Sequence, residues 1–284
     1  KNKYGIIVDE HSRENFKTRS NLLISDNERN KKIVIELAGQ RYTSNQTESN
    51  GHATWVVNLP ESEFNSAKSL SYQAVLKPDD ERIFNGSVRL LPPHGISVIS
   101  DIDDTVKISH VTDRKRLLEY TFLKDFEAVP GMAERYRQWQ ENGMAFHFVS
   151  SSPWYLYEPI TRFLADAEFP GATLSLKSFR FRDKSLLDVF KKGTETKPKA
   201  IEAIIKRYPH RKFILVGDSG EQDPEVYAGI AKTYPEKILK IFIRNIDRSE
   251  ATNKRVTSIL EKTAGTPWQV FRSAEEIELS LLNE

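Results

Sequence analysis

Beyond Gly95, apolar runs of strand length alternate with stretches of helical pattern, and this alternation constrains the fold more than any other feature of the sequence. Strands that are buried on both faces and joined by helices form a mostly parallel sheet. The expected strands are residues 96–99, 144–149, 213–216, 238–243 and 268–271. The expected helices are residues 132–140, 198–207, 225–233, 249–262 and 274–282, the last with a capping box at its start. The sequence therefore predicts an α/β fold whose ligands bind beyond the carboxyl ends of the strands.

The first ninety or so residues have a different pattern, which is typical of β structure. Short runs rich in β-branched and aromatic residues alternate with turn clusters, a spacing that suggests a small all-β, sandwich-like domain. The expected strands are residues 4–8, 32–37, 54–59, 70–76 and 82–90. Paired prolines followed by a glycine then break the pattern. We expect one domain over residues 1–92 and a second over residues 95–284.

The bulk composition excludes several classes of protein. A length of 284 residues suits two domains, and 42 basic against 40 acidic residues give a net charge of +2, which does not favour nucleic-acid binding. No apolar run approaches the ~20 residues of a transmembrane helix. The absence of cysteine excludes disulfides and thiolate chemistry. We therefore expect a soluble protein, either cytoplasmic and peripheral to a membrane or exported with its signal removed.

The first chemical motif directly follows the strand at residues 96–99. Asp101, Asp103 and Asp104 lie within four residues, and Thr105 closes the run. Such crowded carboxylates repel one another unless a cation is present, and Mg²⁺ is a natural partner. One carboxylate can attack phosphorus, and a second can protonate the leaving oxygen and then activate water. The alternative is an acidic turn that only caps a helix.

The second motif follows the strand at residues 144–149. Ser150, Ser151 and Ser152 precede Pro153 and place hydroxyl and N–H groups where a helix is expected to begin. This arrangement suits a bound phosphoryl group, with Ser150 the preferred contact and Ser151 the second. A helix N-cap is the alternative, and it fits Ser152 best.

A third candidate is a lysine at the start of the helix before the next core strand. Pro198 suits the first helical position, so Lys197 would lie at the helix mouth and Lys199 would point along the helix. The ammonium of Lys197 can neutralise phosphate there. A solvated pair of lysines is the other interpretation.

The fourth motif follows the strand at residues 213–216. Asp218 lies directly beyond the strand in a glycine-containing loop and is the expected metal ligand. Asp223 precedes Pro224, so it is either a helix N-cap, an outer partner of the metal, or both.

The four motifs occur along the chain in a fixed order. Over residues 96–245 they resemble the motifs of the haloacid dehalogenase (HAD) superfamily of aspartyl-phosphate phosphatases. The resemblance implies a Rossmann-like core with Asp101 as nucleophile and Asp103 as general acid and base. It implies that Ser150 and Lys197 hold the phosphoryl group, to which we add Ser151 and Thr105. Asp218 would complete a Mg²⁺ site, and the full expected metal set is Asp101, Asp103, Asp218 and Asp223.

The match can be narrowed further. The stretches SDIDDTV, VSSSPW and FILVGDSGEQD resemble the catalytic domain of App1-type phosphatidate phosphatases, which are related to the lipin phosphatases. That family pairs this domain with preceding β structure, in agreement with residues 1–92. This chain departs from the pattern at Thr196, where a histidine is expected before Lys197.

The substrate is less constrained than the reaction. The segments between the motifs are too short for a large cap domain, so we expect an open or lightly covered site; closure by the N-terminal domain is the alternative. Aromatic residues Trp154 and Tyr155 follow the serine loop, and Arg180 and Arg182 alternate with aromatics, which suits an anionic lipid surface or an exposed edge strand. His110 lies near the first motif and is a candidate substrate contact.

From these features we expect a Mg²⁺-dependent phosphatase for phosphatidate or a similar lipid phosphate. The alternatives are a phosphatase for a soluble phosphomonoester and a quiescent module that binds a membrane or a protein.

Overall fold

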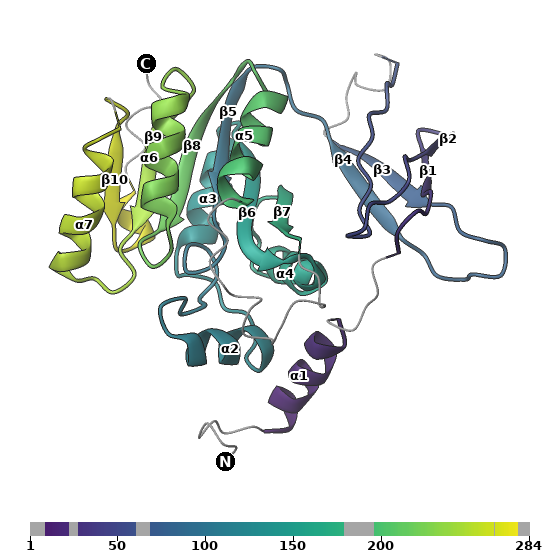
Figure 1. Cartoon of the computed structure of the whole chain (residues 1–284), viewed down its shortest axis with the longest axis horizontal. Coiled ribbons are helices and arrows are strands. Elements are labelled where there is room, and N and C mark those ends of the chain that lie inside the picture. The colour runs from purple at the N-terminus through teal and green to yellow at the C-terminus, as the bar shows by residue number, and fades with distance from the viewer. Residues whose placement is uncertain (1–8, 23–27, 61–68, 179–195, 264, 278–284) are drawn as a thin grey trace. The chain divides into compact units, whose positions relative to one another are not determined.

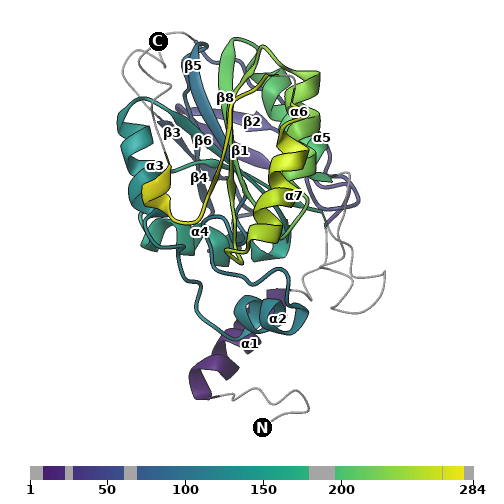
Figure 2. The ribbon, with the colours of Figure 1, turned by 90° about the vertical axis from the view of Figure 1, so that its left-hand side faces the viewer.

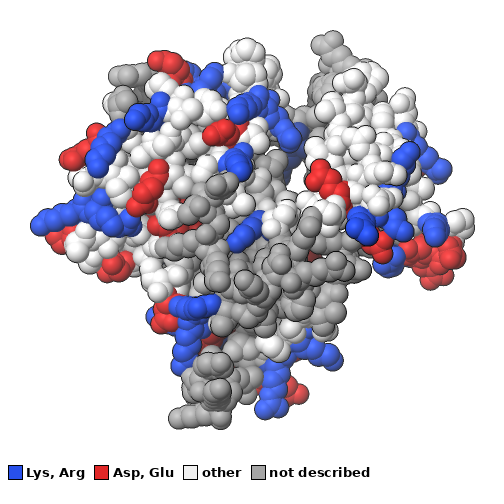
Figure 3. All heavy atoms as spheres, viewed as in Figure 1, with Lys and Arg blue, Asp and Glu red and all other residues white. Residues whose placement is uncertain are grey.

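The computed structural model describes residues 9–22, 28–60, 69–178, 196–263 and 265–277. Contacts divide the chain into two units, one formed by residues 25–92 and the other by residues 1–24 and 93–284. Among the described residues, none of the helices has the length and apolar character needed to cross a bilayer. On the face shown in Figure 3, acidic and basic side chains are interspersed, as the near balance of charge leads one to expect.

The larger unit is built on a sheet of six parallel strands in the order β10-β9-β8-β5-β6-β7 (Figures 1 and 2). These strands are β5 (Gly95–Ser100), β6 (Ala145–Pro153), β7 (Thr173–Lys177), β8 (Arg211–Asp218), β9 (Ile238–Arg244) and β10 (Trp268–Phe271). The five strands that the apolar runs predict are confirmed. The chain first builds outward from β5 through β6 to β7 and then returns to β8 on the other side. Ligand sites in such sheets lie at this change of direction.

Helices cover both faces of this sheet. On one face, α3 (Met132–Glu141) and α4 (Tyr157–Asp166) pack Trp139, Tyr136 and Phe163 against strand residues such as Val98 and Phe148. The other face carries α5 (Thr196–Arg207), α6 (Asp223–Thr233) and α7 (Glu250–Leu260). Two separate apolar clusters result, and the double burial explains why the strands read as continuous apolar runs.

The helix expected over residues 274–282 is wrong at its start. Residues Ala274–Glu276 form a single 3₁₀ turn, and Ile277 is already extended. Glu276 accepts a hydrogen bond from the backbone N–H of Arg272 at 2.8 Å, so the capping-box acid closes a tight turn rather than opening a helix. Residues 278–282 lie outside the described residues.

The β structure predicted for the first ninety or so residues is wrong between positions 10 and 22. The chain forms α1 (Glu10–Leu22) there. This helix belongs to the larger unit and packs beside α2 (Arg114–Phe122), another helix that the sequence patterns did not predict. The Arg19 guanidinium donates to the carbonyl oxygens of Thr121 and Lys124 at 2.9 and 2.7 Å. The expected strand at residues 4–8 lies outside the described residues.

The smaller unit contains an antiparallel sheet in the order β2-β1-β3-β4. Its strands are β1 (Val34–Leu37), β2 (Gln40–Thr43), β3 (Ser69–Ala74) and β4 (Asn85–Arg89). Ala38 and Gly39 both have positive φ, so they form the two-residue turn that folds β2 back onto β1. Residues 54–59 pair with no strand in the described part of the chain, contrary to expectation.

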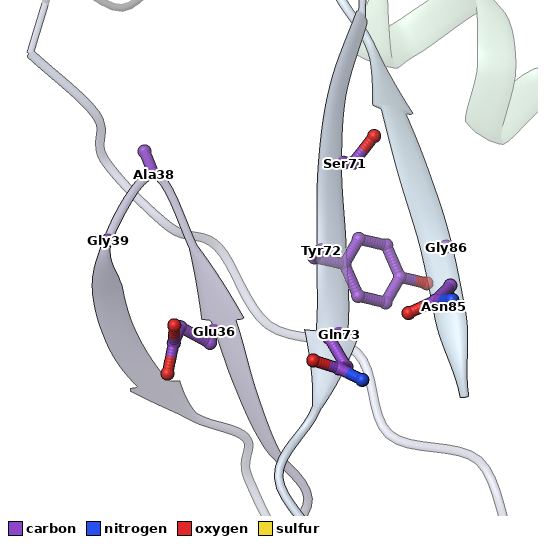
Figure 4. A pocket seen from close by; sticks show the side chains of 8 residues that line it. All are labelled: Glu36, Ala38, Gly39, Ser71, Tyr72, Gln73, Asn85 and Gly86. Carbon is purple, nitrogen blue, oxygen red and sulfur yellow. The ribbon is translucent and has the colours of Figure 1, made fainter. Parts of the chain in front are cut away.

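The β structure of the smaller unit is a single sheet within its described residues. A hollow of about 480 Å³ opens on it, lined by side chains from β1, β3 and β4 and by the turn between β1 and β2 (Figure 4). Glu36, Ser71, Gln73 and Asn85 make this lining polar. The catalytic motifs all lie in the other unit. The bounds expected for two domains, 1–92 and 95–284, stay a prediction.

Candidate active site

The predicted motifs converge at the carboxyl edge of the parallel sheet. The carboxyl ends of β5, β6 and β8 and the loops that follow them supply carboxylates and hydroxyls, and the first turn of α5 supplies a lysine. Because β5 lies between β6 and β8, side chains from three distant parts of the sequence meet within hydrogen-bonding distance.

Asp101 is fully buried where β5 ends. Its backbone N–H donates to the carbonyl oxygen of Val216 on β8 at 2.9 Å, which extends the sheet pairing by one residue. Its Oδ1 accepts from Lys197 Nζ at 2.8 Å, and its Oδ2 accepts from Thr105 Oγ1 at 3.1 Å. Burial raises the pKa of Asp101 well above its ordinary value, although the Lys197 ammonium acts in the opposite direction.

Asp103 is held by four donors. Its Oδ1 accepts from Lys107 Nζ at 2.8 Å and from Ser109 Oγ at 2.7 Å. Its Oδ2 accepts from Ser150 Oγ at 2.9 Å and from Ser152 Oγ at 2.8 Å. Burial acts to raise the pKa of Asp103, but the ammonium and the hydroxyl donors hold the pKa below its usual range. The carboxylate is therefore stabilised in its ionised form.

Asp104 shapes the loop behind the site. Its backbone lies in the left-handed region at φ 55°, and its side chain accepts from the backbone N–H groups of Ser109, His110 and Val111 at 2.6 to 3.0 Å. The ring of His110 packs edge-on against Tyr120 of α2, with centroids 4.5 Å apart. Asp104 thus organises the loop that carries Ser109, a task that the sequence motif left unassigned.

Lys197, in the first turn of α5, points into the site. Its Nζ donates to Asp101 Oδ1 at 2.8 Å, to Glu221 Oε2 at 3.2 Å and to Asp223 Oδ1. Burial alone would lower the pKa of Lys197, but these carboxylates raise it well above its ordinary value. Lys199 is exposed. Of the two candidate lysines, the fold brings Lys197 to the carboxylates.

Asp218 and Asp223 flank the loop after β8, and both are fully buried. Asp218 Oδ1 accepts from the N–H groups of Gly220 and Glu221 at 2.5 and 3.2 Å. Its Oδ2 is buried and has no hydrogen-bond partner among the described residues. Asp223 opens α6, yet its side chain accepts from Lys197 and from the Asp218 N–H instead of capping the helix. The N-cap interpretation of Asp223 is therefore wrong.

The acidic side chains could hold a divalent cation. Ligand oxygens of Asp101, Glu221 and Asp223 all lie within 4.8 Å of one another, with the Lys197 ammonium among them. Burial raises the pKa of Asp218 well above its ordinary value, and the nearby carboxylates raise it further. A buried carboxylate oxygen without a donor destabilises the folded protein unless a cation neutralises its charge. Hard oxygen donors of this kind suit Mg²⁺ or a similar ion.

Two hydroxyls of the serine motif donate to Asp103, and neither of them caps a helix. Ser150 and Ser152 are buried, and Ser150 Oγ also accepts from the Ser152 N–H at 2.9 Å. Ser152, the best N-cap candidate, directs its hydroxyl to Asp103, so that alternative is wrong. Ser151 is partly buried, and its Oγ donates to Glu221 Oε2 at 3.5 Å.

The proposed substrate contacts separate into two groups. Trp154 and Tyr155 lie in the 3₁₀ turn Trp154–Leu156 directly after β6, and Trp154 stacks on exposed Tyr157 with centroids 5.7 Å apart. The hydroxyl of Tyr155 is buried, and burial raises its pKa. Arg180 and Arg182 lie outside the described residues.

Three residues of the site were missed by the sequence patterns. Glu221 stands in the same glycine-containing loop as Asp218, and its half-buried carboxylate contacts Lys197. Lys107 and Ser109 follow the acidic run directly, with Lys107 one helical turn's spacing after Asp103. A basic residue so close to a crowded acidic motif was the available signal.

Residues 96–245 match the sequence family described as "Phosphatidate phosphatase APP1, catalytic domain". "Phosphatidate phosphatase APP1" of Saccharomyces cerevisiae is 35% identical over 156 residues, which cover 54% of this chain and 26% of that protein. An uncharacterized protein of Schizosaccharomyces pombe is 31% identical over 185 residues, which cover 64% of this chain and 30% of that protein.

The chain spans less than a third of the length of these two relatives. Among solved structures, a putative β-phosphoglucomutase from Thermotoga maritima aligns with a TM-score of 0.37 and 15% identity, covering 63% of this chain and 95% of that one.

Proposed function

Because this chain belongs to the family of App1 phosphatidate phosphatase catalytic domains, we propose that it hydrolyses a phosphomonoester through an aspartyl-phosphate on Asp101. The observation that carries the proposal is the setting of Asp101. Its carboxylate is buried at the sheet edge and oriented by Thr105 and Lys197, and with Glu221 and Asp223 it forms a cluster of carboxylates suited to a cation.

In the first half of the reaction, a carboxylate oxygen of Asp101 bonds to phosphorus while the bond between phosphorus and the ester oxygen breaks. Asp103, ionised in the free site, takes up a proton as the phosphomonoester binds and gives it to the departing oxygen, which leaves as an alcohol. In the second half, Asp103 takes a proton from water as that water attacks the phosphorus. Phosphate is released, Asp101 is restored as a carboxylate, and Asp103 is again protonated.

Other side chains bind and orient the phosphoryl group. Lys197 Nζ already contacts Asp101 and supplies positive charge beside it. When bound, Mg²⁺ would neutralise charge on the phosphate oxygens, and we assign Asp101 and Asp218 as the residues that hold it. We leave Asp103 out of this set because each of its oxygens already accepts from two donors, whereas each oxygen of Asp101 accepts from one. Asp223, whose oxygens accept from Lys197 and from the Asp218 N–H, stays an outer partner of the metal.

For the substrate we propose phosphatidate or a similar lipid phosphate. The yeast relative carries the name phosphatidate phosphatase. In this chain, the exposed ring of Tyr157 and its stacking partner Trp154 follow the serine loop at once. Aromatic rings of this kind dock well at a lipid interface.

The test compares wild type with Asp101→Asn for phosphate release from dioctanoyl phosphatidate in detergent micelles and from glycerol 3-phosphate. We expect wild type to act on the lipid in Mg²⁺ and not in EDTA, and Asp101→Asn to lose on the order of 10³-fold or more in kcat. Asp113→Asn, at the exposed N-cap of α2, is the matched control. Near-normal turnover by Asp101→Asn would rule out the covalent mechanism. Activity confined to glycerol 3-phosphate would rule out the lipid substrate.

A further inference from the structure

The two oxygens of Asp103 are held by different kinds of donor. Oδ1 contacts the Lys107 ammonium and the Ser109 hydroxyl, both from the loop that follows the acidic run. Among the described residues, the donors to Oδ2 are the neutral hydroxyls of Ser150 and Ser152, which belong to β6. The two sides of one carboxylate are therefore bound by separate parts of the chain and with different charge.

Lys107 is built into the protein and has little freedom to leave Oδ1. Its side chain is 3% exposed, and its ammonium lies 4.8 Å from the ring centroid of Phe126. Its backbone N–H donates to the carbonyl of Ile102 at 2.9 Å, and its own carbonyl accepts from the Asp104 N–H at 2.7 Å. Ser109 is fixed as well, because the Asp104 carboxylate accepts from its backbone N–H at 2.8 Å.

The donors at Oδ2 are easier to exchange. A serine hydroxyl can rotate about its C–O bond and find another acceptor, such as a phosphate oxygen. A buried ammonium that leaves its carboxylate strands two charges in a medium of low dielectric constant. When a phosphomonoester binds, Oδ2 is therefore the oxygen that can be released toward it.

We propose that Lys107 and Ser109 are positioning residues that anchor Oδ1 of Asp103, so that Oδ2 is the oxygen that exchanges protons with the leaving group and with water. The inference rests on the proposed function. Oδ2 takes up a proton when the phosphomonoester binds, and this proton passes to the ester oxygen as its bond to phosphorus breaks. The carboxylate formed on Asp103 is then balanced by the Lys107 ammonium.

A substrate with sulfur in place of the bridging ester oxygen separates this role from a general structural one. A thiol has a pKa of about 8.5, against about 15.7 for water and a comparable value for an alcohol, so a thiolate departs without a proton donor. Loss of a correctly placed acid therefore slows the oxygen ester and spares the sulfur ester. Loss of fold or of phosphate binding slows both alike.

The experiment measures kcat/KM of Lys107→Met and Ser109→Ala on an oxygen ester and on its bridging-sulfur analogue in Mg²⁺. The lipid pair is dioctanoyl phosphatidate and its bridging-sulfur analogue, and the soluble pair is glycerol 3-phosphate and its bridging-sulfur analogue. The measurements use the pair whose oxygen ester wild type cleaves. Asp103→Asn calibrates the loss of the acid itself. Lys206→Met, the same change at an exposed lysine, is the matched control. Thermal unfolding of each variant reports on its fold.

We expect Lys107→Met to lose roughly 10- to 100-fold on the oxygen ester and less than about 3-fold on the sulfur ester, since general acid catalysis contributes typically 10² to 10⁴. Ser109→Ala should show the same selectivity with a smaller loss. If Lys107→Met does not fold, Ser109→Ala decides. If a variant loses kcat/KM equally on both esters, or loses it on neither, the positioning role is overturned. The proposed phosphatase function is not affected by that result. If wild type cleaves neither pair, both proposals fail together.

Discussion

Lys197 shows how a single residue can hold a crowded acidic site together. Three carboxylates contact its ammonium, and each of them comes from a different segment: Asp101 after β5, Glu221 from the loop after β8 and Asp223 at the start of α6. Without a compensating positive charge, these acids would repel one another in a buried space. Asp218 differs from these three carboxylates, because its Oδ2 has no donor in the described part of the chain.

The first residue-scale prediction concerns this oxygen of Asp218. Mg²⁺ should raise the thermal midpoint of wild type, since a ligand at about 100 times its Kd stabilises by about 2.7 kcal/mol. Asp218→Asn should be at least as stable as wild type in EDTA, because a buried like charge is removed, but its midpoint should not respond to Mg²⁺. Differential scanning fluorimetry with and without Mg²⁺ measures both effects. Asp166→Asn, an exposed acid of α4, is the control, and an equal Mg²⁺ response in Asp218→Asn would contradict the assignment.

A second residue-scale prediction concerns His147, in the interior of β6. Burial, followed by the charges of Arg211 and Arg207, lowers its pKa to about 4. Below the unfolded value of about 6.5, the unfolded chain therefore binds a proton that the folded chain does not. The contribution of His147 to the free energy of unfolding is fully present above pH 6.5 and falls as the pH is lowered toward 4. At pH 5 the loss from this group is about 2 kcal/mol.

Urea unfolding at pH 7 and pH 5 tests this dependence. His147→Asn retains a polar group near Thr173, the present partner of the ring Nδ1, and its free energy of unfolding should fall by about 2 kcal/mol less between the two pH values than that of wild type. Exposed His210→Asn should behave like wild type. The same pH dependence in all three proteins would show that other groups cause it.

At the level of elements, the junction of β8 and α6 has little room for an added side chain. Gly217 lies one residue before Asp218, and a Cβ there would come within 2.3 Å of Asp223 Oδ2 and 2.7 Å of Tyr227 Cε2. The helix can approach the strand closely only because this position lacks a side chain. The same approach brings Asp223 to Lys197.

Gly217→Ala should therefore push α6 away from β8. We expect a loss of about 1–3 kcal/mol in the free energy of unfolding, as for other overpacked sites. Gly229→Ala is the matched control, because nothing lies within 4 Å of its Cβ position on α6, and it should gain up to about 1 kcal/mol from helix propensity. Urea unfolding of both variants measures the difference. A Gly217→Ala protein as stable as wild type would show that the junction adapts at no cost.

At the scale of the whole molecule, the two units differ in their cores. The larger unit has an apolar cluster on each face of its sheet. In the smaller unit, Ile35 and Leu37 are the buried apolar residues of positions 28–60 and 69–92. Because buried apolar area is the main stabilising contribution, the smaller sheet should be the less stable of the two.

We therefore expect hydrogen exchange to reach β1, β3 and β4 at lower urea concentrations than β5 and β8. Mass spectrometry of peptides from one urea series measures both units in the same sample, so each serves as a reference for the other. Simultaneous loss of protection in all these strands would mean that the units unfold as one.

The predictability of the fold follows from where the side chains are buried. Strands such as β8 are covered on both faces, so runs like Phe213 to Val216 identify them without further information. Helices α1 and α2 have mostly polar sequences that pack through a few contacts, such as those of Arg19, and local pattern does not identify them. The 3₁₀ turn Ala274–Glu276 shares the capping pattern of a helix, but its Glu276 carboxylate accepts from the Arg272 N–H instead, which the pattern does not distinguish.

By itself, the sequence determined the parallel sheet and the loops at its carboxyl edge, because buried strands need apolar runs and polar residues must follow where those runs end. The tertiary structure decided which side chains meet there. Lys107 turns to Asp103, Lys197 turns to three carboxylates and Asp218 keeps one oxygen without a described donor. These pairings depend on distances between segments far apart in the chain, and charge balance in a buried space depends on those distances.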